Sequence, residues 1–338
     1  MSDGTSESGL VLRLRAFART FSEIVGWHRL GIVLSLAIIA LAAVALRRKL
    51  SGVDVDQVIA ALRGTPIVNV LIAAFLVAGS YVSYTFFDLF ALRTIGRPDI
   101  PYRVAALAAF TAYAIGHNLG ATLFTGGAVR YRIYSAYALS VIDIAKIAFV
   151  TGLTFWLGNA VMLGLGMAWQ PDAASAVDQL PPWLNRIWAV ALLVAVLAYL
   201  AWVWRFGPAI GRNGWQLRLP SAPLTLAQIA LGVFDLGCAG LATYVLMPAT
   251  PEIGLLSLVV VFLLSLLIGF ASHSPGGLGV FDAAMLVALQ QFDREALLAS
   301  LLLFRLLYFI IPFALALTIL GGRELWINLR SRAGGDRK

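Results

Sequence analysis

The chain has 338 residues, of which 60% are apolar and 12% are charged, and its formal net charge at neutral pH is +8. Because soluble domains carry about a quarter charged residues, and the mean hydropathy here is +0.87, the composition excludes an ordinary soluble protein and indicates an integral membrane protein. The positive charge does not indicate nucleic-acid binding, since the lysines and arginines lie in short loops and tails, as membrane topology requires. A single cysteine, Cys238, excludes an internal disulfide.

Apolar segments long enough to span about 30 Å of hydrocarbon follow one another along the chain. They are residues 30–46, 67–92, 104–124, 147–168, 187–204, 226–247, 254–272 and 297–320. We therefore expect an all-α polytopic membrane protein with about eight apolar helices in one integral membrane domain, residues 30–320. Residues 1–29 are basic and form either an amphipathic interfacial helix or a solvated tail, and residues 321–338 form a basic tail.

Two of the apolar segments run into glycine-rich sequences. Residues 104–124 precede Thr-Gly-Gly-Ala-Val-Arg, and residues 254–272 precede His-Ser-Pro-Gly-Gly-Leu-Gly. Proline lacks a backbone donor and glycine adopts conformations closed to other residues, so a helix should break at each place. Backbone groups freed at membrane depth need protein or a wet cavity around them. The sequence thus predicts two re-entrant hairpins with the hinge residues Gly126, Gly127, Pro275, Gly276, Gly277 and Gly279.

The charges in the loops predict the topology. Arginines precede the first apolar segment and follow the last, which favours cytoplasmic termini, whereas residues 169–185 contain no lysine or arginine and are expected in the periplasm. Each half must then cross the membrane an odd number of times, so one of its four helices folds back as a hairpin. Loops 93–103 and 205–218 fall in the cytoplasm, while the basic loop 47–49 falls outside, against the rule.

The two halves also resemble each other in sequence. Asp88 and Asp235 lie in matching Phe-Asp-Leu triplets, at an offset of 235 − 88 = 147, and the two Gly-Gly pairs are offset by 276 − 126 = 150. Sequence similarity with opposite orientation is the inverted repeat of many transporters, whose discontinuous helices meet near the midplane. We expect residues 30–168 and 187–320 to form two inverted four-helix repeats, each with a glycine-broken re-entrant hairpin.

Charged residues lie inside the apolar segments. An ionised side chain at the centre of a membrane helix costs roughly 2.5 kcal/mol or more, so Asp88 and Asp235 need a partner or a wet surface. The alternative for Asp88 is an interfacial ion pair with Arg93. Arg130 follows the first glycine break and Asp282 the second, which places a cation in one hairpin and an anion in the other.

These charges are predicted to form one electrostatic unit around a substrate site. Arg130 is expected to pair with Asp88 first and with Asp282 second. Arg305, eight residues into the last apolar segment, is expected to face protein, at Asp282 or Asp235.

Three further polar residues precede the breaks. His117, Asn118 and His273 could hydrogen-bond a lipid headgroup, or they could satisfy the backbone groups that the breaks set free. The candidate substrate-binding residues are therefore Asp88, Arg130, Asp235, Asp282, Arg305, His117, Asn118 and His273.

The sequence contains no motif of classical enzymology. It has no GxxxxGK[ST] phosphate loop, no HExxH, no GxSxG elbow and no His/Cys cluster with metal-ligand spacing. We expect no catalytic residue, no cofactor, no metal and no direct use of ATP.

Several stretches resemble a known family. FTGGAVRYRIY, LSVIDIAKI, TGLTFWLG, SHSPGGLGVFDAAML and FRLLYF are similar to the membrane domain shared by lysylphosphatidylglycerol synthases and stand-alone flippase-like proteins, over about residues 30–320. Position 282 departs from the family pattern, which has glutamate there. The synthases carry a soluble aminoacyl-transferase domain after the membrane part, whereas this chain stops at Lys338, so lipid synthesis is not expected.

The resemblance implies a function in lipid transport. The expected function is translocation of a phospholipid, such as the aminoacylated lysyl-phosphatidylglycerol, between leaflets of the bacterial inner membrane. The alternative is a lipid-binding accessory subunit of a separate lipid-modifying enzyme. A membrane-embedded transferase is a third possibility, but no nucleophile or metal site supports it.

Overall fold

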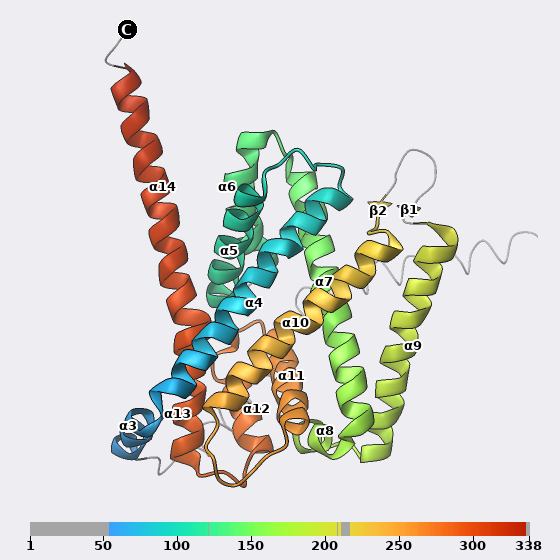
Figure 1. Cartoon of the computed structure of the whole chain (residues 1–338), viewed down its shortest axis with the longest axis vertical. Coiled ribbons are helices and arrows are strands. Elements are labelled where there is room, and N and C mark those ends of the chain that lie inside the picture. Colours follow the sequence, from blue (N-terminus) through green and yellow to red (C-terminus); the bar gives the residue numbers. More distant parts are fainter. Residues whose placement is uncertain (1–53, 121, 208, 211–216, 336–338) are drawn as a thin grey trace, which may run out of the picture.

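The computed structural model describes residues 54–335 apart from 121, 208 and 211–216. The predicted first apolar segment, the basic segment 1–29 and the loop 47–49 lie outside the described residues. After the short helix α3 (Val55–Gly64) the chain is almost entirely helical (Figure 1). One two-stranded ribbon, β1 (Ala209–Ile210) with β2 (Leu217–Arg218), interrupts the helices.

Helices long and apolar enough to cross a membrane occur at five places in the described residues. They are α4 (Ile67–Thr94), α7 (Val141–Trp169), α9 (Pro182–Phe206), α10 (Ala222–Leu246) and a continuous helix built from α13 (Arg294–Arg305), the π-helical turn η3 (Leu306–Ile310) and α14 (Ile311–Gly335). Each contains one predicted apolar segment to within one residue, so this part of the prediction is confirmed. The short α8 (Pro171–Asp178) joins α7 to α9.

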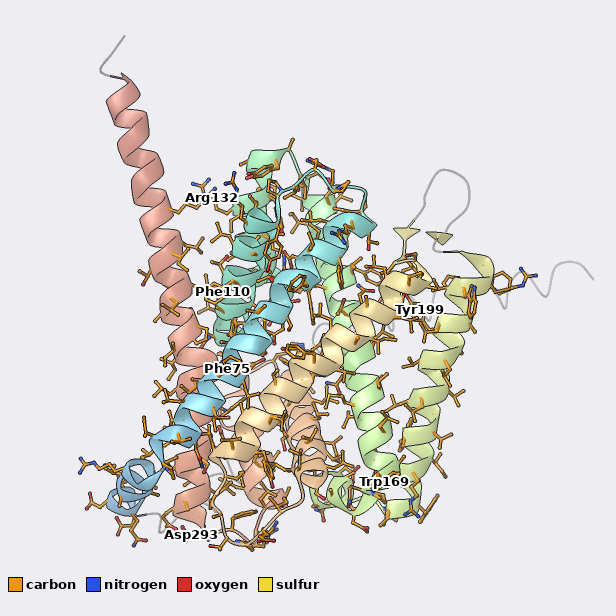
Figure 2. The ribbon with its side chains drawn as sticks, in the orientation of Figure 1. Phe75, Phe110, Arg132, Trp169, Tyr199 and Asp293 are labelled. Atoms are coloured by element: carbon orange, nitrogen blue, oxygen red, sulfur yellow. The ribbon has the colours of Figure 1, made fainter. Side chains whose placement is uncertain are left out.

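Large apolar side chains cover the outer faces of these helices (Figure 2). Phe75 on α4 and Trp169 at the end of α7 are 79% and 78% exposed, and Trp204 on α9 is 84% exposed. A water-soluble protein rarely exposes so much contiguous apolar surface. The outside of the molecule is therefore suited to contact lipid.

The first predicted hairpin is present, but its break lies elsewhere. Helices α5 (Tyr102–Leu119) and α6 (Thr122–Tyr134) pack against each other, and the chain turns at Gly120, whose φ of 74° and ψ of −177° suit only glycine. The predicted break at Gly126 and Gly127 is wrong, because both glycines continue α6. Neither residue removes a backbone donor, so the helix tolerates them.

These two glycines differ in what surrounds them. A Cβ atom on Gly126 would lie 3.2 Å from the carbonyl oxygen of Ala112, so this glycine lets α6 approach α5 closely. Around Gly127 there is open space. The second glycine of the motif therefore has no hinge function in the fold.

The second hairpin breaks where the sequence predicts. Helix α11 (Leu255–Ala271) ends in a turn that continues through η2 (Pro275–Gly277) into α12 (Val280–Ala288). His273, Gly276, Gly277 and Gly279 have φ values of 54°, 59°, 61° and 78°. Left-handed backbone at consecutive positions explains why glycine predominates here.

The two hairpins enter the molecule from opposite ends and meet in its interior (Figure 1). A Cβ atom on Gly120 would lie 3.3 Å from Cα of Pro275, and one on Gly276 would lie 3.6 Å from the carbonyl oxygen of His117. Helices α4 and α10 cross beside the meeting point. The loop before α5 and the β1–β2 ribbon lie at one end of the molecule, and α8 lies at the other, as the charge pattern predicts for the two sides of a membrane.

Candidate functional site

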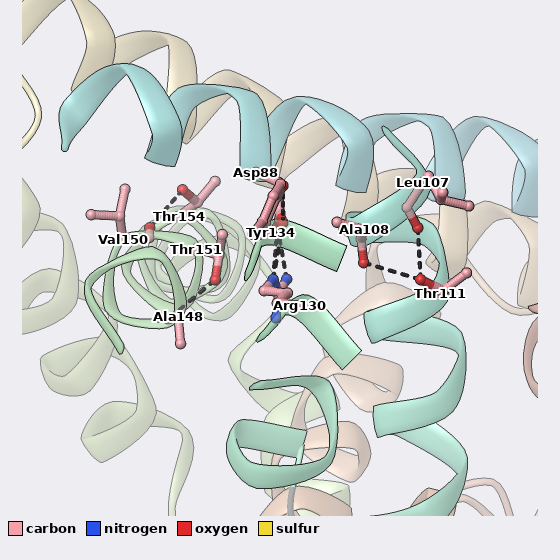
Figure 3. A network of polar contacts seen from close by, with 10 residues as sticks. All are labelled: Asp88, Leu107, Ala108, Thr111, Arg130, Tyr134, Ala148, Val150, Thr151 and Thr154. Atoms are coloured by element: carbon pink, nitrogen blue, oxygen red, sulfur yellow. Dashed lines mark hydrogen bonds and ion pairs between the residues drawn. The ribbon is translucent and has the colours of Figure 1, made fainter. Parts of the chain in front are cut away.

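Arg130 on α6 forms a buried ion pair with Asp88 on α4 (Figure 3). Its Nε donates to both carboxylate oxygens at 3.1 and 3.0 Å, and Nη2 donates to Oδ1 at 2.8 Å. Tyr134 Oη donates to Oδ2 at 2.9 Å, and the guanidinium lies over the Tyr113 ring, 4.9 Å from its centroid. With Asp88 0% and Arg130 3% exposed, the predicted pairing is confirmed, and the interfacial alternative with Arg93 is wrong.

Arg305 at the end of α13 forms the second interior ion pair, with Asp282 on α12. Nε donates to Oδ1 at 2.9 Å and Nη2 to Oδ2 at 2.6 Å. The same guanidinium donates to the carbonyl oxygens of Gly276 at 3.1 Å and Gly277 at 3.4 Å. Arg305 therefore faces Asp282, as expected, and its hydrogen bonds also stabilise the backbone conformation of the hairpin tip.

Asp235 on α10 belongs to neither pair. Ser80 on α4 donates its hydroxyl hydrogen to Asp235 Oδ1, and no cation lies within ion-pair distance among the described residues. Because Asp88 stands eight residues beyond Ser80 on the same helix, the two carboxylates are separated by about 12 Å along α4. The prediction of one electrostatic unit is therefore wrong: the charges form two ion pairs and one lone carboxyl.

The polar residues next to the breaks differ in their contacts. Asn118 Nδ2 donates to the carbonyl oxygen of Ala114, one turn earlier in α5, at 2.8 Å and to that of Phe309 in the π-helical turn at 3.0 Å. It therefore satisfies backbone groups, but at the π-helical turn and not at a carbonyl that a glycine break sets free. His273 is exposed, with Nδ1 3.0 Å from the carbonyl oxygen of Ala271. His117 packs among aromatic rings, and its Nδ1 has no hydrogen-bond partner among the described residues.

A cavity of about 110 Å³ lies where the two hairpin tips meet. Its polar lining consists of Tyr84, His117, Thr122, His273, Ser274 and Tyr308. The rest is apolar and largely aromatic, with rings from α7, α11, α12 and α13. Both ion pairs lie outside this lining, so the described cavity wall is polar and aromatic but carries no arginine, lysine or carboxylate.

Sequence reasoning missed Ser80 and Tyr84, which link the lone carboxyl to the cavity. Both precede Asp88 on α4 at spacings of eight and four residues, which places them on one face of the helix. A polar stripe on an otherwise apolar membrane helix was the available signal.

The described residues contain no cluster of His, Cys, Asp and Glu side chains that could hold a metal ion.

The amino-acid sequence has relatives among known proteins. Residues 30–316 match the family described as lysylphosphatidylglycerol synthase TM region. Inner membrane protein YbhN of Escherichia coli (strain K12) is 31% identical over 274 residues, which is 78% of this chain and 83% of that protein. Uncharacterized protein slr0712 of Synechocystis is 29% identical over 255 residues, 75% of this chain and 79% of that protein.

A longer relative is the phosphatidylglycerol lysyltransferase of Staphylococcus aureus (strain MRSA252). It is 22% identical over 319 residues. The match covers 91% of this chain but 36% of the lysyltransferase. The similarity is therefore to one part of that protein, and it carries no statement about the remainder.

Proposed function

The chain belongs to the lysylphosphatidylglycerol synthase transmembrane-region family, and on that premise we propose that it translocates a phospholipid between the leaflets of a bacterial inner membrane. One observation carries the proposal: two half-length hairpins enter from opposite ends and enclose a cavity with polar groups where they meet. Discontinuous helices that meet inside a membrane are typical of transporter substrate sites. A headgroup could pass such a site while its acyl chains remain in the surrounding lipid.

We propose that the two hairpins belong to an inverted repeat. Helix α4, the hairpin α5–α6 and helix α7 would correspond to α10, the hairpin α11–α12 and the long helix α13–α14. Three pairs of similar features support this: the intramembrane aspartates of α4 and α10, the two interior ion pairs, and an acidic residue at the start of α7 and of α13. Asp143 in the first turn of α7 accepts a hydrogen bond from the Ser140 amide, and Asp293 at the N-cap of α13 accepts one from the Ala296 amide. In this arrangement the arginine-containing loops and both termini lie in the cytoplasm.

The interior charges suit a lipid headgroup that contains both signs. The cavity wall offers hydrogen-bonding groups such as Tyr84, Ser274 and Tyr308 rather than charges. To meet charges, a headgroup would have to displace a partner from one of the ion pairs outside the wall, so that Arg130 or Arg305 holds its phosphate or Asp88 or Asp282 its amine. A zwitterionic headgroup could replace the partner in either ion pair without leaving a charge uncompensated. An aminoacylated phospholipid such as lysyl-phosphatidylglycerol presents these groups, and the printed name of the staphylococcal relative supports that lipid class.

The alternative function is that of a lipid-binding accessory subunit of a separate lipid-modifying enzyme, with no enzymatic activity of its own. Both interior arginines are already paired with aspartates, which favours the accessory function, because a site that only binds lipid does not need to open to both leaflets. A headgroup-resolved flipping assay in proteoliposomes separates the two functions. A translocator moves labelled lipid between leaflets, whereas an accessory subunit binds lipid and leaves leaflet asymmetry unchanged.

A further inference from the structure

A hydrogen-bonded network lies where α4, α10 and η3 meet. At its centre is Asp235, which is 1% exposed and has Ser80 Oγ as donor to Oδ1. Its second oxygen, Oδ2, has no donor among the described residues. A carboxylate ion without a cation beside it would be costly at this depth.

No titratable neighbour supplies the missing positive charge. Those that face Asp235 are Tyr81 and Tyr84 of α4, Tyr308 of η3, Cys238 of α10 and, farther away, Tyr113 of α5. His117 of α5 packs on the rings of Tyr84 and Tyr308, on the cavity side of the network, and has no hydrogen bond to Asp235. The other helices packed on α10 supply no free cation at Asp235 either. Helix α11 has no titratable residue, and Arg305 of α13 is bound to Asp282. On α7, Asp143 and Lys146 pair with each other, and the described titratable residues of α9 are Arg186, Tyr199 and Arg205. Protonation is therefore the available way to neutralise Asp235.

The Ser80 hydroxyl can form two different hydrogen-bond arrangements with Asp235 and Tyr308. Its hydroxyl lies within hydrogen-bond distance of Asp235 Oδ1 and also 3.4 Å from Tyr308 Oη, yet it carries one hydrogen. When Asp235 is ionised, Ser80 donates to the carboxylate. When Asp235 is protonated, the acid donates to Ser80, and the serine hydrogen turns toward Tyr308.

The network continues from Tyr308 to the cavity. Tyr308 Oη and Tyr84 Oη are 2.6 Å apart, and both side chains line the cavity at the hairpin tips. Two side chains from the first half of the chain stabilise the π-helical turn around Tyr308: Tyr81 Oη donates to the Tyr308 carbonyl oxygen at 2.9 Å, and Asn118 donates to that of Phe309. Such π turns occur frequently at functional sites.

We propose that Asp235 exchanges one proton with the cavity through Ser80, Tyr308 and Tyr84, and that this exchange couples lipid movement to the transmembrane proton gradient. On release, the O–H bond of the carboxylic acid breaks and Ser80 Oγ accepts the proton. Ser80 passes its own hydrogen to Tyr308, Tyr308 passes one to Tyr84, and Tyr84 gives one to water or to a headgroup oxygen in the cavity. The carboxylate remains on Asp235, and uptake reverses each step. The coupling half of this inference rests on the proposed function, whereas the proton site does not.

Infrared difference spectroscopy of the protein in nanodiscs tests the proton site without any transport measurement. Spectra recorded across a pH titration should contain the carbonyl band of a buried carboxylic acid, and the band should be lost in Asp235→Asn. In Ser80→Ala the band should persist but exchange with deuterium more slowly, because the relay is interrupted. Asp99→Asn, which changes an exposed carboxylate, is the matched control and should keep the band. A wild-type spectrum without the band, or a band that survives in Asp235→Asn, overturns the proton site.

Flipping in proteoliposomes under an imposed pH gradient tests the coupling. The wild-type rate should change when an ionophore collapses the gradient, and Asp235→Asn should lose that response. A wild-type protein that flips lipid at one rate with and without the gradient overturns the coupling while leaving the proposed translocation intact. Absence of flipping in every condition would instead refute translocation, and with it the coupling; the infrared result would still decide the proton site.

Discussion

The two hairpins perform the same structural task with opposite charges and different anchoring points. In the first, the cation Arg130 lies ten residues after the bend at Gly120 and ties α6 to Asp88 of α4. In the second, the anion Asp282 lies beside the bend, and its partner Arg305 also binds the carbonyl oxygens of the tip. The first ion pair therefore fixes the hairpin as a body to the neighbouring helix, whereas the second fixes the conformation of the tip itself.

The two ion pairs also differ in how deeply their side chains are buried. The side chains of Arg130 and Asp88 are 4% and 0% exposed, against 9% and 15% for Arg305 and Asp282. The more buried pair is expected to determine stability, because neither of its charges can recover hydration when its partner is removed. The less buried pair is expected to determine the shape of the cavity.

The largest effect is expected for the first ion pair. Arg130→Ala or Asp88→Asn leaves a buried charge without a partner, which typically costs about 3 to 5 kcal/mol, while the double variant should recover much of that loss. Thermal unfolding in detergent measures the stability, with flipping assayed in parallel. Flipping should stay impaired in the double variant, since the headgroup partner is gone. Wild-type stability in all three variants would mean that the pair contributes nothing to the fold.

The bend of the first hairpin should be the next most sensitive position. Gly120→Ala forces a side chain into a backbone region almost restricted to glycine and brings Cβ within 3.3 Å of Pro275 Cα; strain of this kind costs about 1 to 3 kcal/mol. Gly127→Ala is the matched control, because that glycine is helical with open space around it, and alanine there should stabilise α6 by up to about 1 kcal/mol. Equal melting temperatures for the two variants would place the hinge elsewhere.

At the second hairpin, Arg305→Lys should change function more than stability. A lysine ammonium keeps the charge, but it lacks the planar fork that reaches Asp282 and both glycine carbonyls together. The loss of charged hydrogen bonds is expected to cost about 1.5 to 3 kcal/mol, together with a marked fall in flipping rate. Unchanged flipping in this variant would show that the tip conformation does not depend on Arg305.

The smallest effect is expected for the exposed ion pair in the loop after α4. Two hydrogen bonds from Arg97, at 2.9 and 3.0 Å, hold the pKa of Asp99 below its usual value. A depressed carboxyl pKa contributes stability above the unfolded pKa, near 4, and that stability is lost as the pH falls through the folded pKa. Both groups are exposed, so Asp99→Asn should shift the melting temperature little at neutral pH and not at all in strong acid. A large shift would show that this loop stabilises the fold.

The long membrane helices could be predicted from hydrophobicity alone, because a long run of apolar residues between charged loops in a membrane protein is almost always a spanning helix. It also located the second break, where proline and left-handed glycines act together. The first break was misplaced because Gly126 and Gly127 remain helical, and the actual bend depends on a lone Gly120 packed against Pro275, a contact between segments far apart in the sequence. The pairing of Arg130 with Asp88 followed from the cost of a lone buried charge.

The separation of the charges into distinct sites could not be predicted in the same way. It depends on where α4, which carries Asp88, crosses α10, which carries Asp235, and the sequence does not specify crossing points. For the same reason the link from Asp235 to the cavity through Ser80 and Tyr84 became visible only once α4, α10 and η3 were placed together.

The central claim is that a lipid headgroup passes the cavity between the hairpin tips, and thiol labelling inside that cavity tests it most directly. Ser274 lines the cavity, so Ser274→Cys in a Cys238→Ala background provides a single reactive site, and Ser135→Cys provides an exposed control at the end of α6. We predict that a bulky thiol reagent on Ser274→Cys blocks flipping, that bound phospholipid slows the labelling there, and that labelled Ser135→Cys flips at its unlabelled rate. Flipping at full rate after complete labelling of Ser274→Cys would contradict the account.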